Sequence, residues 1–298
     1  MLSLILLPIM AIFIGIISAM LGIGGGAFIV PMLILVPYYS LSPAVASGTS
    51  LAAIVFTSAS STLRYMRQRR IDHLLGLFLA LTTVPGAFLG SYSKRIIDNR
   101  LLGVIFSVFL MFVAVRMFTE KKAVRNWIRR GNLKAIHRKI IDNYGETFIY
   151  SVDPRLTPIL GLSAGFFSGL LGIGGGSILV PAMNLIIGVP MHLSIATSMF
   201  IMVFTSIFET LTNLWLGQVR LDYAVLLAAG VIFGAQIGAH IAAMVSARNL
   251  RRIFRRDPDI DEHKDASQIH RYDALKIILL ALNIRSSALS SRALPHTP

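Results

Sequence analysis

Long apolar stretches that hold few charged residues are the feature that most limits how this chain can fold. They lie at about residues 2–21, 26–37, 44–63, 74–93 and 101–118, and again at 156–171, 177–189, 193–216, 222–246 and 274–284. A transmembrane helix needs about 20 predominantly apolar residues, and several stretches reach that length. The sequence therefore predicts an all-α integral membrane protein that crosses the bilayer several times.

The composition excludes a soluble globular protein. Charged residues make up 14% of the chain, against about 25% in a typical soluble protein, and 55% of the residues are hydrophobic. The mean hydropathy is +0.71, which leaves too few polar residues to cover a soluble fold. Because the chain has no cysteine, a disulfide framework, a thiol nucleophile and a thiolate metal site are excluded as well.

The positive charges follow the apolar stretches. The chain holds 28 Lys and Arg against 14 Asp and Glu, a formal net charge of +14. The cations gather at Arg64–Arg70, Arg116–Lys139 and Arg248–Arg256, each beside an apolar stretch. Juxtamembrane cations are typical of the cytoplasmic side of a membrane. We therefore expect the lipid bilayer, and no nucleic acid, as the partner of this charge.

The sequence contains an internal repeat. Residues 15–31, GIISAMLGIGGGAFIVP, and residues 165–181, GFFSGLLGIGGGSILVP, are identical at ten of seventeen positions. Because the first apolar stretch has this internal counterpart, we expect it to belong to the fold rather than to a signal peptide. Duplicated halves of a polytopic chain are typical of secondary transporters, which bind their substrate where the repeats meet near the midplane.

The repeat divides the chain into three parts. We expect a first transmembrane repeat at residues 1–118, a basic cytoplasmic linker at 119–155 and a second repeat with a basic tail at 156–298. Each repeat has about four to five segments, with helices broken at glycine. Five segments, an odd number, would invert the second half relative to the first. This scheme puts the basic clusters inside and Lys94, Arg95, Arg100 and Arg220 outside, as the positive-inside rule prefers. Whether 274–284 crosses the membrane stays open.

Two interpretations of the linker also stay open. Its apolar residues stand among many Arg and Lys, a pattern that fits an amphipathic helix on the cytoplasmic surface. A solvated basic segment fits the same pattern equally well. The apolar residues are Trp127, Ile128, Leu133, Ile136 and Ile140.

Each repeat carries a glycine cluster between two apolar arms, at residues 22–26 and 172–176. Glycine permits unusual dihedrals and close approach to backbone N–H groups. The helix after each cluster exposes free N–H donors and the positive end of its dipole, which makes an anion site without a fixed charge. The alternative is a tight helix–helix crossing. The candidate substrate-binding glycines are Gly24, Gly25, Gly26, Gly174, Gly175 and Gly176.

Two Thr-Ser pairs at matching repeat positions add candidate substrate-binding residues. Thr49 and Ser50, like Thr197 and Ser198, are expected to begin the next helix of each half, where their hydroxyls can donate to an oxyanion. The alternative is that these hydroxyls cap their own helices. A second set of glycines has the spacing of close helix packing and is assigned to structure: Gly86, Gly90, Gly234 and Gly238.

Two ionisable residues lie well inside apolar stretches, Glu209 and His240. Burying a charged side chain in a bilayer costs about 2.5–3.5 kcal/mol or more, so such residues are functional candidates by default. Both are candidates for coupling transport to protons or for gating. Neither is repeated, because Glu209 aligns with Ser61 and His240 with Tyr92. A neutral or paired structural role is the alternative for each.

At the two GIGGG…VP clusters, the Thr-Ser pairs and the Pro85-Gly86-Ala87…Gly90 segment, the chain resembles the sulfite exporter TauE/SafE family of membrane permeases. The resemblance covers about residues 5–250. It implies a multi-pass carrier of small sulfur-containing anions, with Gly24–Gly26, Gly174–Gly176 and both Thr-Ser pairs near the substrate. It also implies Pro31 and Pro181 at the same motifs. The second half departs from the first at Arg255–Arg271, a polar insertion before the last apolar run.

These observations together predict a plasma-membrane permease for small anions such as sulfite, sulfoacetate or sulfonates. The expected partners are the anion, the lipid bilayer and, as an open question, a second copy of the chain in a homodimer. A channel or non-transporting membrane protein is the alternative, followed by a membrane-embedded enzyme. One carboxylate and one histidine on different spans are too few groups to form a catalytic site. We therefore expect no catalytic residue, no metal site and no cofactor.

Overall fold

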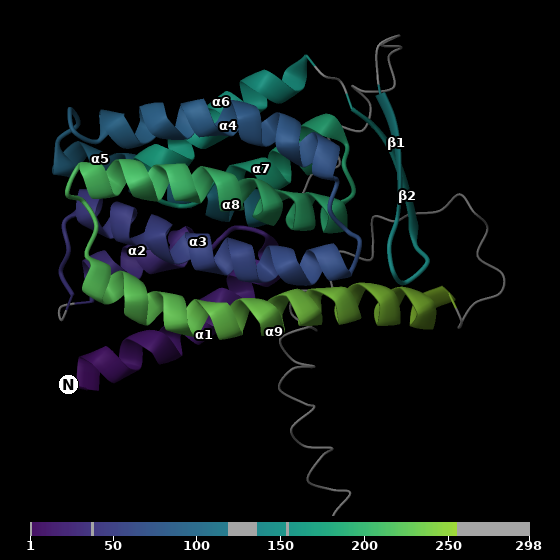
Figure 1. The fold of residues 1–298 in the computed structure, drawn as a ribbon, viewed down its shortest axis with the longest axis horizontal. Helices are drawn as coiled ribbons and strands as arrows, with labels where there is room; N and C mark the ends of the chain where they lie inside the picture. Colours follow the sequence, from purple (N-terminus) through teal and green to yellow (C-terminus); the bar gives the residue numbers. More distant parts are fainter. Residues whose placement is uncertain (1, 37–38, 119–135, 153–154, 255–298) are drawn as a thin grey trace, which may run out of the picture. The chain divides into compact units, whose positions relative to one another are not determined.

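The computed structural model describes residues 2–36, 39–118, 136–152 and 155–254. Met1–Asn249 form one compact unit, separate from Leu250–Pro298, and the packing described below is that of the first unit. The unit is mostly helical (Figure 1). Its helices are α1 (Leu2–Leu21), α2 (Gly26–Leu35), α3 (Pro43–Arg67), α4 (His73–Ser93), α5 (Asn99–Phe118), α6 (Leu156–Leu171), α7 (Gly176–Ala182), the π-helix η1 (Met183–Ile187), α8 (Met191–Trp215) and α9 (Leu221–Phe254).

Four helices in the described part of the chain are long and apolar enough to span a membrane, judged by length and composition. They are α3, α4, α8 and the Leu221–Met244 portion of α9. The arms that follow the glycine clusters are short, as predicted: α2 has 10 residues, and α7 has 7 before η1 prolongs it. The last apolar stretch, 274–284, lies outside the described residues.

The two repeats are interlocked, because the fourth helix of each packs on the first helix of the other. A Cβ at Gly86 or Gly90 of α4 would collide with the carbonyl oxygens of Leu162 and Phe166 in α6. Backbones can approach this closely only where side chains are absent. The assignment of these glycines to helix packing is confirmed. The same contact joins α9 to α1, at Gly234 with Ile12 and Gly238 with Ile16.

The third helices of the two repeats, α3 and α8, pack against each other in antiparallel orientation. Thr49, near the start of α3, meets Arg220, which follows the end of α8. At the opposite end, Thr197 near the start of α8 meets Asp72, which follows the end of α3. Figure 1 shows the two helices running side by side through the middle of the unit.

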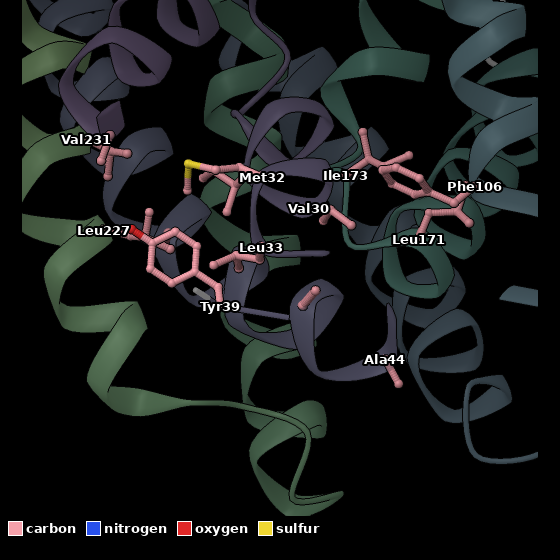
Figure 2. Close-up of a cluster of buried hydrophobic side chains, with 14 of the residues drawn as sticks. Val30, Met32, Leu33, Tyr39, Ala44, Phe106, Leu171, Ile173, Leu227 and Val231 are labelled. Atoms are coloured by element: carbon pink, nitrogen blue, oxygen red, sulfur yellow. The ribbon is translucent and has the colours of Figure 1, made fainter. Parts of the chain in front are cut away.

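An apolar cluster anchors α2 among helices from both repeats (Figure 2). Val30 and Leu33 of α2 are 1% and 0% exposed. The short helix is therefore held by tertiary packing, as a ten-residue helix must be, because such a length is marginal alone. The other labelled members of the cluster are Met32, Tyr39, Ala44, Phe106, Leu171, Ile173, Leu227 and Val231.

The linker contains a β-hairpin, so the prediction of an all-α fold is wrong in this segment. Strand β1 (Ile136–Ile141) pairs antiparallel with β2 (Thr147–Val152), with Ile136 opposite Val152. Of the two interpretations of the linker, the amphipathic helix that includes Ile136 and Ile140 is therefore wrong where the linker is described. Trp127, Ile128 and Leu133 lie outside the described residues.

The physical reason for the hairpin is a strong turn between two strand-forming segments. Gly145 adopts a φ of +81°, and the Asp142 carboxylate accepts the N–H groups of Tyr144 and Glu146 at 2.9 and 2.8 Å. Asp and Gly stabilise turns in these ways. The flanking segments, IHRKII and TFIYSV, are rich in β-branched and aromatic residues, which favour strands.

Two ion pairs fasten the hairpin to the α3–α4 loop. Arg70 donates to Asp142 at 3.0 and 2.9 Å, and Arg138 donates to Asp72 at 3.1 and 2.5 Å. The Tyr150 hydroxyl also donates to Asp72. Burial raises the pKa of Asp72, but hydrogen bonds from Arg138 and Tyr150 outweigh it and hold the pKa below its ordinary value.

Candidate functional site

The two glycine clusters form turns that join α1 to α2 and α6 to α7; we call residues 22–26 and 172–176 the glycine turns. Gly22 and Gly172 end the first helix of each repeat at φ of +74° and +70°. Gly24 and Gly174 have φ of +82° and +78°. Since glycine adopts these dihedrals without the penalty of a Cβ, both turns share one conformation at these positions.

The glycine turns contact each other in the interior. A Cβ at Gly26 would collide with the backbone of Gly172, and a Cβ at Gly176 would collide with the backbone of Gly22. Each short helix therefore begins against the first glycine of the opposite turn. The sequence offered two interpretations of the glycine clusters, a shared site and a tight helix–helix crossing. The contact between the turns fits both.

The two predicted serines bridge the repeats at this contact. The Ser50 hydroxyl of α3 donates to the carbonyl of Gly172 at 2.6 Å. The Ser198 hydroxyl of α8 donates to the carbonyl of Gly22 at 2.9 Å. Both hydroxyl protons are thus used by the protein, and either serine must turn away from its carbonyl before it can donate to an anion.

The two predicted threonines also bridge the repeats, through acceptor contacts. Thr49 accepts the N–H of Arg220 at 3.0 Å, and Thr197 accepts the N–H of Asp72 at 3.1 Å. Their expected place at the start of a helix is wrong, because α3 begins at Pro43 and α8 at Met191. Proline suits the first position of α3, so that helix starts six residues before Thr49. For the same reason, neither pair caps its own helix.

Six backbone N–H groups of the glycine turns have no hydrogen-bond acceptor among the described residues. They belong to Gly24, Gly25, Gly26, Ile173, Gly174 and Gly175. The Gly176 N–H, in contrast, donates to the Met202 sulfur at 3.3 Å.

Met202 and Ile54, at equivalent repeat positions, fill the space between the turns. Cβ atoms built at Gly24 and Gly174 lie 2.8 and 3.2 Å from the Met202 sulfur and 3.3 and 3.1 Å from the Ile54 side chain. Both side chains are fully buried. The centre of the candidate site is therefore lined by backbone donors and closed by two apolar side chains.

Two repeat-related serines lie on the other side of the glycine turns. Ser18 and Ser168 are 0% and 1% exposed, and neither hydroxyl has a hydrogen-bond partner in the described structure. The Ser18 hydroxyl lies 3.0 Å from a Cβ built at Gly25, and the Cβ of Ser168 lies 3.8 Å from one built at Gly175. Each turn thus has an unpaired hydroxyl beside its unpaired N–H groups.

Glu209 is fully buried, as its position predicted, and both of its carboxylate oxygens lack a hydrogen-bond partner. The sequence missed two polar neighbours, Lys94 and Asn213. Lys94 was expected in an outer loop, yet it is 3% exposed and donates to Asn213 Oδ1 at 2.7 Å. Its position directly after an apolar stretch, and the place of Asn213 one turn after Glu209, were the available signals.

His240, the other candidate coupling residue, lies on the surface of the described unit, within the apolar portion of α9. Its side chain is exposed on α9, and its Nδ1 lies 2.6 Å from Nη2 of Arg64 at the end of α3. The apolar stretch around His240 forms one helix, and His240 lies on the outward face of that helix. His240 therefore does not join Glu209.

Glycine-broken helices, interlocked repeats and spanning-length apolar helices define a polytopic α-helical membrane protein. The profile of the sulfite exporter TauE/SafE family matches residues 7–255. The chain belongs to this family, and its identity as a membrane transporter is confirmed at that level.

Curated relatives match over most of their length. The probable membrane transporter protein YunE of Bacillus subtilis is 32% identical over 85% of this chain and 93% of its own. A probable membrane transporter protein of Methanocaldococcus jannaschii is 27% identical, over 83% and 91%. The Bacillus subtilis protein YjnA, with the same description, is 26% identical, over 83% and 93%. No solved structure matches the chain.

Proposed function

We propose that this chain is a plasma-membrane carrier of small anions, and that its substrates are sulfur-containing oxyanions such as sulfite, sulfoacetate or sulfonates. The observation that carries the proposal is the meeting of two repeat-related glycine turns, each of which holds backbone N–H groups without an acceptor. Unpaired donors in an interior are costly, and donors at helix starts favour anions. The unpaired hydroxyls of Ser18 and Ser168 add two further donors beside the turns.

The description of the family supports the sulfur-containing substrate class, and the names of the relatives support transport. We further infer that the two halves have inverted topology. The antiparallel packing of α3 on α8 supports this, since these helices are repeat counterparts. The hairpin and the basic ends of α3 and α9 then face the cytoplasm, where the positive-inside rule puts them.

Uptake into proteoliposomes tests the function. Purified protein is reconstituted and offered radiolabelled sulfite, sulfate, a sulfonate and a carboxylate, with and without a proton gradient. The carrier proposal predicts saturable uptake and counterflow of the sulfur oxyanions. Flux without saturation or counterflow would favour a channel, and absence of flux for every anion would refute the proposal.

A glycine pair tests the site. Gly175→Val places a side chain beside an unpaired N–H, at a residue whose φ of −55° any residue adopts. Gly103→Val in α5 is the matched control, because a Cβ there meets nothing within 4 Å. We expect Gly175→Val to lower sulfite uptake at least tenfold and the control to leave it unchanged. Equal uptake in both variants would return the glycines to a packing role.

A further inference from the structure

A buried polar cluster lies beside the second glycine turn and is not repeated in the other half. Lys94 follows α4 directly, and Glu209 and Asn213 come from α8; their exposed fractions are 3%, 0% and 0%. Ser47, Ser91 and Ser168 complete the cluster from α3, α4 and α6. We call these six residues the Lys94 cluster.

The Lys94 ammonium is held in place by neutral groups. It donates to the Ser47 hydroxyl at 2.9 Å and to Asn213 Oδ1 at 2.7 Å. The Asn213 amide donates in turn to the backbone carbonyl of Glu209 at 2.6 Å and to the Ser91 hydroxyl at 3.3 Å. Asparagine therefore fixes the ammonium without neutralising it.

The Glu209 carboxylate, which could neutralise Lys94, lies near it but does not form a direct ion pair with it. The Glu209 carboxylate and the Lys94 ammonium interact electrostatically, yet no pair of their atoms lies within the 4.0 Å of an ion pair in the described structure. Both carboxylate oxygens lack a hydrogen bond of ordinary geometry, and the Ser168 hydroxyl is the neighbouring donor that faces them. A buried charge is normally paired directly, so the cluster has unused capacity for an ion.

The cluster touches the glycine turn itself. Ser47, which accepts from Lys94, lies so close to Gly172 that a Cβ there would collide with its hydroxyl. Ser168, beside Glu209, accepts the Gly172 N–H through its backbone carbonyl at 2.8 Å. Lys94 is therefore linked through Ser47 to Gly172, the first residue of the turn.

We propose that Lys94 is the fixed cation that binds the transported anion, and that Glu209 is the competing counter-ion. Protonation of Glu209 frees Lys94 to bind the anion. The proposal rests on the anion-carrier function above. Glu209 carboxylate takes one proton from the aqueous phase and becomes neutral, and one monoanion then pairs with the Lys94 ammonium. The cluster gains one positive and one negative charge, so its net charge is unchanged. The carrier thus moves one proton with each monoanion.

The broken repeat symmetry supports one such site for each chain. The positions equivalent to Lys94 and Glu209 are Ala242 and Ser61. The position equivalent to Asn213 is Tyr65, whose hydroxyl donates to the Ala19 carbonyl at 2.7 Å. The side chains that act on Glu209 in the described structure are Ser168, which does not titrate, and Lys94, the charged group facing it.

The test measures the affinity for a sulfonate and proton uptake as a function of pH, in detergent-purified protein and in proteoliposomes, because a sulfonate stays a monoanion where sulfite changes its own charge. For the natural chain we expect tighter sulfonate binding at lower pH and one proton taken up with each monoanion. Glu209→Gln should bind the sulfonate with little dependence on pH and should lose the coupled proton uptake. Lys94→Gln/Glu209→Gln removes both charges together, so no unpaired charge is left buried. It should bind the sulfonate at least tenfold more weakly. Arg95→Gln, the exposed neighbour, is the matched control and should behave as the natural chain.

Two outcomes overturn the inference and can be told apart from a failure of the carrier proposal. If the natural chain carries the sulfonate and the folded double variant binds it equally well, Lys94 is not the anion site. If Glu209→Gln retains proton uptake, Glu209 is not the counter-ion. If the natural chain neither binds nor moves any anion of the panel, the carrier function fails and this inference fails with it.

Discussion

At the residue scale, the flexible side chain of Met202 occupies the centre of the candidate site. Met202 accepts the Gly176 N–H and fills the gap between the glycine turns. Met202→Leu conserves volume, which costs less than about 1.5 kcal/mol, and removes the sulfur acceptor. We expect the KM for sulfite to fall about twofold or more, because a freed N–H donor strengthens anion binding by about 0.5–1.5 kcal/mol. Met199→Leu, a buried neighbour on the same helix, is the control, and an equal KM in both variants would contradict the expectation.

The same residues show what the sequence could and could not predict at this scale. The repeat predicted that the glycines, threonines and serines of the two halves come together, because equivalent positions meet around a common axis. It could not predict that Ser50 and Ser198 give their protons to carbonyls. It also could not place Lys94 inside, since a cation at the end of an apolar stretch has the same sequence context whether it is buried or solvated.

At the scale of helices, the close contact of α4 with α6 explains why glycine stands at its crossing points. Gly90→Val would drive a side chain into the Phe166 carbonyl, and overpacking of this kind typically costs about 1–3 kcal/mol, occasionally more. We expect a clear drop in the Tm of the purified protein. Gly103→Val, which has open space around it, should lower the Tm far less. A Tm that is equally high in both variants would mean that α4 and α6 separate without cost.

The hairpin makes a second prediction, about pH. The pKa of Asp72 is lowered in the fold, so its ion pair contributes stability in full above its ordinary pKa of 3.8 and loses it as the pH falls further. We expect the hairpin to resist limited proteolysis at pH 7 and to become cleavable as the pH falls below about 4. Arg138→Gln should make it cleavable already at pH 7. Lys139→Gln, at the exposed neighbour, should not, and equal protection of both variants would show that the ion pair does not hold the hairpin.

The helices were predicted well because the length of each apolar stretch indicated them. The linker was predicted poorly because the prediction depended on the spacing of its apolar residues. The apolar stretches gave the long helices and the short arms, because twenty apolar residues have few other uses. The linker was misjudged because Ile136 and Ile140 fit a helical spacing of four. The same segment, IHRKII, is rich in β-branched residues and leads into a turn at Gly145, and that signal was the stronger one.

At the scale of the whole molecule, inverted and parallel repeats make opposite predictions about one pair of positions. His73 begins α4 and Leu221 begins α9, so they are repeat equivalents, and both side chains are exposed. The antiparallel packing of α3 on α8 puts the loops that precede these residues at opposite ends of the unit. The chain has no cysteine of its own, so His73→Cys and Leu221→Cys each give a single label site. In sealed cells, a membrane-impermeant thiol reagent should label Leu221→Cys and spare His73→Cys until the membrane is opened. Labelling of both positions from one side would establish parallel halves. The loop before His73, which carries the hairpin, and the loop with Arg220 would then lie on the same side of the bilayer.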